Sequence, residues 1–420
     1  MPAQETPPSS PSIHSDLNDN NDEDEEMAPF LEEDMIEILD ETDISRPLES
    51  DEEDEDEDEG EGEAAGSVET IPERDDSQLV FKEHSKDVLT CDFHPSKNTV
   101  VASGGMDDTV YIWDTTNGNK LFTCKGHEES VEIVSFSFDG SYLATADLNG
   151  VIKVWRIRDY NLILTFELED ELGWLQWHVG TNVLVASSQN GMVYMYKVPS
   201  GDTKVVIPEF GQNCLAGKIL PDGKSLACGY SNGCLKIVDL RQGTTLKDVK
   251  PVDEIGGITC LDVHKSNNLI ICGSTSGAVI LINSNNGKVV SVLQGVQSPD
   301  SKSYIEAVSF CKDPSHQVAA SGSLDGNLII WDIVKQSLRH KHNFSSCINH
   351  LAWHPSLPLI FTCHFEGIVR AFDAKAGEVK REFLGHQKSC LNMGLSRDGS
   401  LLMTASEDNT VRIFSVGDIM

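Results

Sequence analysis

Basic residues are nearly missing from the first 76 residues of this 420-residue chain. That segment holds 31 acidic residues and two basic ones, Arg46 and Arg74, and carries most of the net charge of -36 that the chain has at pH 7. It also contains a single aromatic residue, Phe30. A segment with so much charge and so little apolar surface cannot offset the entropy lost on folding. The sequence therefore predicts a disordered acidic tail over residues 1–76.

The densest part of this tail, DEEDEDEDEGEGE at residues 51–63, has eleven carboxylates and no base. A polyanion of this kind repels nucleic acid and anionic membranes and attracts cationic partners. We therefore expect a basic protein as partner and no direct contact with nucleic acid. Acidic tails also keep proteins soluble, and that second interpretation stays open.

Paired cysteines and long apolar runs are absent as well. The eleven cysteines, from Cys91 to Cys390, form no C-x-x-C pair, which argues against a disulfide framework or a zinc site. No run of 18 apolar residues is present, so no membrane span is expected. The opening MPAQETPPSSPS lacks the basic and apolar regions of an export signal. The expected location is cytoplasmic, with nuclear or peripheral membrane pools as alternatives.

Motifs that would indicate chemistry are each explained more simply. GEGEAA at residues 60–65 matches a dinucleotide string but lies among carboxylates, with no strand before it and no helix after it. HLAWH at residues 350–354 has metal-ligand spacing only on a helix and lacks the glutamate of a zinc protease. RHKHNF at residues 339–344 is basic but stands alone in an acidic chain. We therefore expect no catalytic residue, no cofactor and no metal.

A repeat organises the chain after residue 76. SGGMDDTVYIWD (residues 103–114), SGSLDGNLIIWD (321–332) and TASEDNTVRIFS (404–415) follow one pattern of small residues, a turn aspartate, an alternating strand and an aromatic residue. Counting weaker copies, the last apolar position recurs at 113, 155, 196, 238, 282, 331, 372 and 414. A period near 42 residues made of short strands and Asp-Gly or Asn-Gly turns is typical of propeller blades. Eight copies predict an all-β propeller of eight blades over residues 77–420.

The closure of the ring can also be predicted. The last copy ends at Phe414, six residues before the C-terminus, so its outer strand is missing. The stretch SQLVFKEH, residues 77–84, precedes the first copy and has strand character. We expect residues 79–81 to supply the missing outer strand, because this hides two sheet edges and ties the ring shut.

These repeats resemble the WD-repeat family. Gly-His at 126–127 and 385–386 and Trp-Asp at 113–114 and 331–332 match the elements of that family. The resemblance implies a buried hydrogen-bond network in each blade, and such a network must be fully satisfied. The structural residues it implies are His127, His386, Asp107, Asp325, Asp408, Trp113, Trp155 and Trp331. Asn149, Asn190, Asn232 and Ser276 replace the turn aspartate in other copies, so blades three, four, five and seven should depend more on apolar packing.

In such a propeller the Gly-His loops and the aspartate turns emerge on one face around the channel. Acidic residues are frequent in those loops, and basic ones are few, which predicts a face that attracts cations. The candidate partner-binding residues are Asp108, Glu128, Glu129, Asp147, Glu169, Asp170, Glu171, Asp253, Glu254, Glu366 and Glu407. Each of them could also be an ordinary solvated loop acid.

One tail segment, MAPFLEEDMIEILDETD at residues 27–43, has apolar residues at helical spacing between acids. Short segments of this kind commonly fold on docking. The residues expected to dock, on a partner or on the propeller itself, are Phe30, Leu31, Met35, Ile36, Ile38 and Leu39.

The combination of acidic tail and degenerate propeller resembles one branch of the WD-repeat family. The stretches that carry this resemblance are residues 35–43, 49–63, 88–95, 220–233, 336–342 and 366–370. The resemblance implies a monomeric, non-enzymatic binding protein with two alternative roles. One is a chaperone that escorts a basic large-subunit ribosomal protein during ribosome assembly, and the other is a signalling scaffold for cell migration and angiogenesis.

Overall fold

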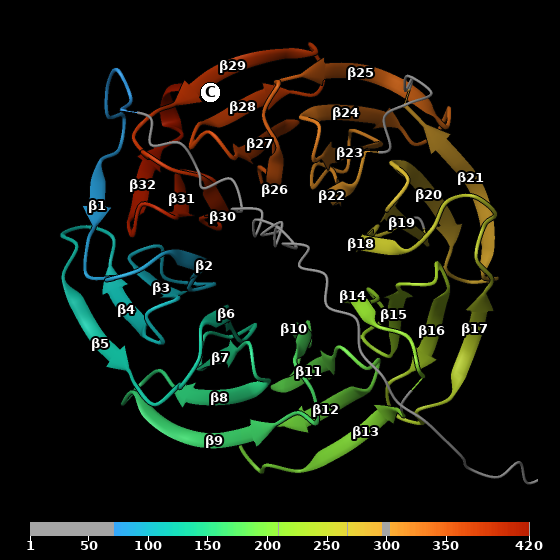
Figure 1. Cartoon of the computed structure of the whole chain (residues 1–420), viewed down its shortest axis with the longest axis horizontal. Helices are drawn as coiled ribbons and strands as arrows, with labels where there is room; N and C mark the ends of the chain where they lie inside the picture. Colours follow the sequence, from blue (N-terminus) through green and yellow to red (C-terminus); the bar gives the residue numbers. More distant parts are fainter. Residues whose placement is uncertain (1–70, 209, 267, 296–302, 420) are drawn as a thin grey trace, which may run out of the picture. The chain divides into compact units, whose positions relative to one another are not determined.

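The structure, a computed structural model, describes residues 71–208, 210–266, 268–295 and 303–419. Over these residues, strands β1 to β32 form eight four-stranded antiparallel sheets arranged in a ring around a central axis (Figure 1). The innermost strand of each sheet contacts the innermost strands of the two neighbouring sheets, and β30 of the last sheet contacts β2 of the first. The eight-bladed all-β propeller predicted from the repeat is confirmed.

The strands have equivalent places in blades one to eight. The inner strands are β2 (Val88–Phe93), β6 (Val131–Phe136), β10 (Leu172–Trp177), β14 (Cys214–Ile219), β18 (Ile258–Val263), β22 (Ile305–Phe310), β26 (Ile348–Trp353) and β30 (Cys390–Leu395). The second strands are β3 (Val100–Gly105), β7 (Tyr142–Asp147), β11 (Val183–Ser188), β15 (Ser225–Tyr230), β19 (Leu269–Ser274), β23 (Val318–Ser323), β27 (Leu359–His364) and β31 (Leu401–Ser406).

The third strands are β4 (Val110–Asp114), β8 (Val151–Arg156), β12 (Val193–Lys197), β16 (Leu235–Asp239), β20 (Ala278–Asn283), β24 (Asn327–Asp332), β28 (Val369–Asp373) and β32 (Val411–Ser415). The outer strands are β5 (Lys120–Cys124), β9 (Asn161–Glu167), β13 (Thr203–Ile207), β17 (Thr245–Val249), β21 (Lys288–Gln294), β25 (Ser337–Asn343), β29 (Glu378–Phe383) and, for blade eight, β1 (Leu79–Phe81). A 3₁₀ turn, η1 (Gly417–Ile419), follows β32. None of the described helical residues forms a segment long and apolar enough to cross a membrane.

The apolar core lies between neighbouring blades. Ile112 of blade one packs in the same cluster as Val134 and Trp155 of blade two, and the pattern repeats around the ring. The second strands are buried almost throughout, because small residues such as Ala102 and Ala144 let two sheets approach closely. Burial of these faces is the main source of stability for the ring.

Strand β1 is the outer strand of blade eight, at the place expected for residues 79–81. It pairs antiparallel with β32, with Leu79 opposite Ile413 and Phe81 opposite Val411. The ring of Phe81 stacks on Trp113 of blade one at 4.6 Å between centroids. The first and last parts of the described chain therefore hold each other in place.

The ordered contacts of the propeller begin before residue 77, where the sequence placed the boundary of the tail. Asp75 pairs with Arg412 of β32, and the backbone N–H of Asp76 donates to the carbonyl of Leu384 at 2.8 Å. An Asp76 carboxylate oxygen in turn accepts the N–H of Leu384 at 3.0 Å. These two aspartates therefore belong to the propeller.

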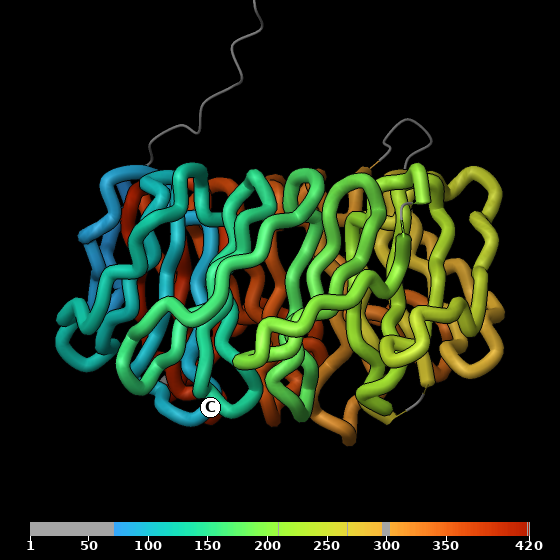
Figure 2. The backbone as a smooth tube through the Cα atoms, turned by 90° about the horizontal axis from the view of Figure 1, so that it is seen from below, coloured from blue at the N-terminus to red at the C-terminus, as the bar shows by residue number. Residues whose placement is uncertain are grey.

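The two faces of the propeller are built from different connections. The upper face, at the top of Figure 2, consists of the loops that lead from one blade's outer strand into the next inner strand and of the turns between second and third strands. The lower face consists of the remaining connections and of the C-terminal end of β32. The loops that carry His127 and His386 lie on the upper face, and so does the contact between Asp76 and Leu384.

Candidate functional site

Buried hydrogen-bond networks shape the upper face. In blade one, the Trp113 indole N–H donates to Ser103 Oγ at 3.2 Å, Ser103 Oγ lies 2.9 Å from His84 Nε2, and His84 Nδ1 lies 3.0 Å from Asp107. His84 was not identified from the sequence, because Glu83 stands where the family pattern has glycine. Its distance of 29 residues from Trp113, against 28 between His127 and Trp155, is the signal that could have found it.

Blade two has the same network with one shifted member. His127 Nδ1 lies 2.7 Å from Asp147 and Nε2 lies 2.7 Å from Thr145 Oγ1, which also accepts the Trp155 indole N–H at 3.0 Å. Asp147, predicted to bind a partner, is therefore a structural residue with a side chain that is 2 % exposed. It stands two residues before Asn149, so the carboxylate reaches the histidine from the end of β7. The prediction for Asp147 was wrong.

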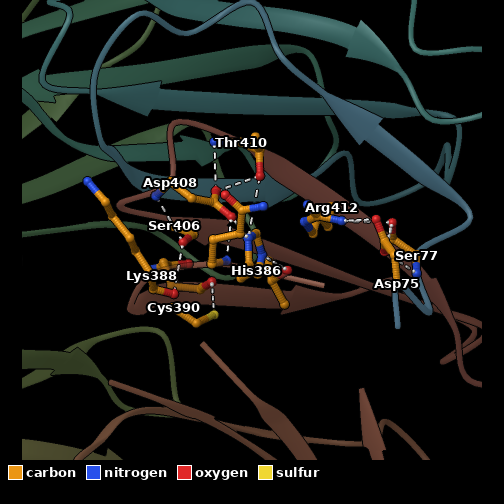
Figure 3. A network of polar contacts seen from close by, with 12 residues as sticks. Asp75, Ser77, His386, Lys388, Cys390, Ser406, Asp408, Thr410 and Arg412 are labelled. Carbon is orange, nitrogen blue, oxygen red and sulfur yellow. Dashed lines mark hydrogen bonds and ion pairs between the residues drawn. The ribbon is translucent and has the colours of Figure 1, made fainter. Parts of the chain in front are cut away.

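Blade eight closes its network without tryptophan (Figure 3). His386 Nδ1 lies 2.9 Å from Asp408. His386 Nε2 lies 2.7 Å from Thr404 Oγ1, and the buried Phe414 stands at the repeat position that tryptophan has in blades one, two and six. Burial lowers the pKa of His386, although the hydrogen bond to Asp408 opposes that shift. Burial alone would raise the pKa of Asp408, but hydrogen bonds, first that from His386, hold it below its ordinary value. A neutral imidazole that donates from Nδ1 and accepts at Nε2 satisfies both partners.

The remaining blades depart from this network. In blade six the Trp331 indole N–H donates to Ser321 at 2.9 Å, and Asp325 accepts from the Ser323 hydroxyl. In blade seven a histidine inside the second strand, His364, lies 2.8 Å from Thr362 Oγ1. Within blades three to five, as far as the structure describes them, no histidine pairs with an aspartate in this way.

The exposed acids of the upper face concentrate at blades one to three. We define the acidic sector as Asp108, Glu128, Glu129, Glu169, Asp170 and Glu171. Asp108 is half-buried, and the other five are exposed. The three connections that carry the sector, residues 106–109, 125–130 and 168–171, contain one basic residue, Lys125. The sector therefore has a strong excess of negative charge in adjacent loops.

Two members of the sector are held in place by local contacts. Asp170 accepts the backbone N–H of Glu171 at 2.9 Å, and a Glu171 carboxylate oxygen accepts from the Gln189 amide at 2.8 Å. The carboxylates of Glu128 and Glu129 make no hydrogen bond or ion pair with any residue that the structure describes. Their full charge is available to a ligand.

Other predicted acids lie elsewhere on the upper face. Asp253 and Glu254 are exposed in the loop between β17 and β18, and Glu407 is half-buried in the turn before β32. Glu366 is 2.6 Å from Arg370, which also binds Glu382 at 2.8 Å. Arg370 compensates part of the charge of Glu366, so this residue offers less to a partner than the sector does. The predicted tail residues from Phe30 to Leu39 lie outside the described residues.

Metal ligands, reactive thiols and cavities are the features of the described residues that could indicate chemistry. No three His, Cys, Asp or Glu side chains gather there in a way that could hold a metal ion. Burial raises the pKa of thiols such as Cys124 and Cys272, which makes them poor nucleophiles. Two cavities of about 490 Å³ each open on the lower face, one beside Lys97 and Arg158 and the other beside Lys224 and Arg241, away from the acidic sector.

Comparison with known proteins agrees with the fold. Residues 76–114 and 118–156 match the model of the WD domain, G-beta repeat, and residues 201–419 match that of the nucleolar protein 10-like N-terminal domain. The chain is 35 % identical over 364 residues to the human angio-associated migratory cell protein, covering 84 % of this chain and 82 % of that protein.

Fungal proteins are more distant relatives. The ribosome assembly protein SQT1 of Saccharomyces cerevisiae is 23 % identical over 380 residues, covering 81 % of this chain and 86 % of that protein. The crystal structure of Sqt1 from Chaetomium thermophilum bound to the N-terminus of the ribosomal protein L10 superposes with a TM-score of 0.73 at 21 % identity, covering 82 % of this chain and all of that one.

Proposed function

This chain belongs to the WD-repeat family of the angio-associated migratory cell protein, and from that premise we propose that it is a non-enzymatic escort for a basic client. The client is a large-subunit ribosomal protein before it meets ribosomal RNA. The observation that carries this proposal is the acidic sector, where adjacent loops hold six carboxylates and one lysine. Such a surface supplies substitute anions for the Lys and Arg side chains that RNA later neutralises.

The entry of the chain into the propeller supports the same role. Asp76 is fixed at the upper face by its backbone and side-chain contacts with Leu384. Twelve residues, 64–75, connect the acid run at residues 51–63 to this point of the chain. Charge attraction from both parts would speed capture of a cationic protein.

The relatives indicate which basic protein to test first. One fungal relative is named a ribosome assembly protein. A fungal protein with this fold has been solved in complex with the N-terminus of ribosomal protein L10. We extend that client class to this chain. Release would follow because ribosomal RNA offers a denser array of anions than the propeller does.

Affinity purification of the full chain from ribosome-depleted cytosol tests the proposal. Mass spectrometry at low and high salt should find one basic large-subunit ribosomal protein near one-to-one stoichiometry, lost at high salt. The pair Glu128→Lys and Glu129→Lys should abolish capture. The matched pair Asp202→Lys and Glu378→Lys changes the charge equally at exposed positions near the lower face and should leave capture intact.

The alternative role, a scaffold for migration signalling, predicts a different result. It requires several partners, present below one-to-one stoichiometry, that resist salt and bind equally to both charge-reversal pairs. The name of the human relative is the observation in its favour. Recovery of such a set without a ribosomal protein would replace the escort by the scaffold.

A further inference from the structure

A ring of equivalent positions surrounds the central axis on the upper face. In every blade, the first residue after the second strand donates its backbone N–H to the carbonyl of the residue before the inner strand, at 2.8 to 3.1 Å. The donors of this ring are Met106, Leu148, Gln189, Ser231, Thr275, Leu324, Phe365 and Glu407. One hydrogen bond thus fixes the same backbone position eight times, and only the side chains differ.

The side chains divide this ring into two parts. Blades three, four and five carry Gln189, Ser231 and Thr275, whereas blades six, seven, one and two carry large apolar residues. We define the apolar arc as Tyr304, Leu324, Phe365, Met106 and Leu148, with 44, 47, 43, 40 and 38 % of their surface exposed. Tyr304 belongs to the arc because its carbonyl accepts the Leu324 N–H at 3.0 Å.

The arc is continuous in the ring apart from blade eight, which contributes Glu407. The inner strand of blade eight contacts the inner strands of both blade seven and blade one, so Phe365 and Met106 flank Glu407. Polar residues at the equivalent positions of blades three to five show that the fold does not require apolar ones there. Large apolar side chains exposed at neighbouring positions of one face make that face a candidate binding surface.

The charges around the arc decide what can cover it. Asp108 follows Met106 closely in the same turn, Glu366 follows Phe365, and Glu407 lies between them. A second copy of this chain would bring the same acids against each other. The tail segment at residues 27–43 contains seven acids and no base, so the same repulsion applies to it. RNA and anionic lipid are repelled as well.

A basic peptide with large apolar side chains fits both features. We propose that the upper face reads an extended client segment in which Arg or Lys alternates with aromatic or aliphatic residues. The cations pair with the acids, and the apolar side chains pack on the arc. This inference rests on the proposed function and names what separates the client from other basic proteins. Charge governs capture, and the arc governs specificity.

Two synthetic peptides of equal length and charge test the inference on the full chain. One alternates Arg with Tyr, and the other alternates Arg with Ser. Fluorescence anisotropy at low salt should show that both peptides bind the protein and that the Arg-Tyr peptide binds more tightly by roughly tenfold or more, while rising salt should weaken the binding of both. This comparison needs no variant, so it stands even where a substitution unfolds the chain.

Variants then locate the binding site. The pair Leu324→Ser and Phe365→Ser should weaken the Arg-Tyr peptide by roughly tenfold or more and leave the Arg-Ser peptide unchanged. Val334→Ser removes a more exposed apolar side chain, 74 % exposed, from the lower face and should change neither. Equal affinity of the two peptides would overturn the inference and leave the escort role intact. Failure of both peptides to bind in a salt-sensitive way would overturn the escort role and the inference together. A dimer in sedimentation that the variant pair abolishes would instead assign the arc to a second copy.

Discussion

The upper and lower faces of the propeller both carry many acids in short connections, but they use them differently. On the lower face, Asp139, Asp222 and Asp398 accept backbone N–H groups within their own turns at 2.8 to 3.0 Å. On the upper face, Glu128 and Glu129 have no such partner among the described residues. An acid-rich composition is therefore compatible with two roles, and the hydrogen-bond partners of each carboxylate distinguish them.

The pKa values of the lower-face aspartates reflect these hydrogen bonds. Burial alone would raise the pKa of Asp139, but hydrogen bonds from the Ser141 backbone and from the Ser137, Ser141 and Asn182 side chains together lower it to about 2. Hydrogen bonds from Ser396 and Ser400 lower the pKa of Asp398 as well. These lower-face carboxylates are already satisfied. An incoming cation would have to compete with the turn, whereas at Glu128 and Glu129 on the upper face it would not.

Removing the buried acid of the upper face should have the largest effect on stability. Asp147→Ala leaves the His127 Nδ1–H buried without its acceptor, so we expect a loss of about 3 kcal/mol in the free energy of unfolding. Asn149→Ala, at the exposed turn position two residues later, is the matched control and should cost less than about 0.5 kcal/mol. Urea denaturation measures both. Equal losses would show that the network depends on the turn rather than on Asp147.

Mild acid should affect the half-buried His350 of β26 and the buried His364 before it affects the lower-face aspartates. Burial lowers the pKa of His350 to about 4 and that of His364 to about 3, from an ordinary value of 6.5. A neutral buried base stabilises the fold fully above pH 6.5, and that contribution falls as the unfolded chain takes up protons below it. As the pH falls from 6.5 to 4, each histidine should lower the free energy of unfolding by about 1.4 kcal/mol per pH unit.

A variant separates the two groups in this titration. His350→Leu should reduce the loss in the free energy of unfolding between pH 6.5 and 5 by the contribution of one histidine, about 1.4 kcal/mol per pH unit. Urea denaturation at each pH measures this. The lower-face aspartates, with pKa values held below 3.8, should contribute only below pH 4. An unchanged slope in His350→Leu would mean that its imidazole is protonated in the folded state.

The sequence predicted the architecture because blade packing repeats along the chain. The spacing of the terminal apolar residues from Trp113 to Phe414 is set by four short strands per blade, and every blade buries the same faces. The networks were harder to predict, because a buried hydrogen bond depends on where an atom lies in space. Asp147 reaches His127 from two residues away from the expected turn position, and His364 lies in a strand instead of a loop.

The apolar arc escaped the sequence for a related reason. Met106, Leu148, Leu324 and Phe365 share no motif, and each looks like an ordinary residue after a strand. They become equivalent only through the register of the second strand against the inner strand, which fixes the same N–H to carbonyl bond in each blade. The acids were easier to find, because the loops that contain Gly-His can be located from the repeat alone.

A lower-face aspartate should have a moderate effect on stability and none on binding. Asp222→Ala removes the acceptor of the Lys224 and Ser225 backbone N–H groups, at 2.8 and 2.9 Å, and of the Ser225 hydroxyl. We expect a loss of about 1–2 kcal/mol in the free energy of unfolding. Lys224→Ala keeps the turn and should be close to neutral. A drop in affinity for the Arg-Ser peptide in Asp222→Ala would place client binding on the lower face.

Neutralising two upper-face acids should have the smallest effect on stability. Glu128→Gln and Glu129→Gln remove two exposed charges that no described residue compensates, so the free energy of unfolding should change by less than about 0.5 kcal/mol. Affinity for the Arg-Ser peptide should nevertheless fall, and its dependence on salt should become weaker, because fewer ion pairs form on binding. Peptide titrations at several salt concentrations measure this. A stability gain without any change in the salt dependence would mean that these acids only repel one another. A weaker salt dependence at unchanged stability is the result expected of carboxylates that the fold leaves free for a partner.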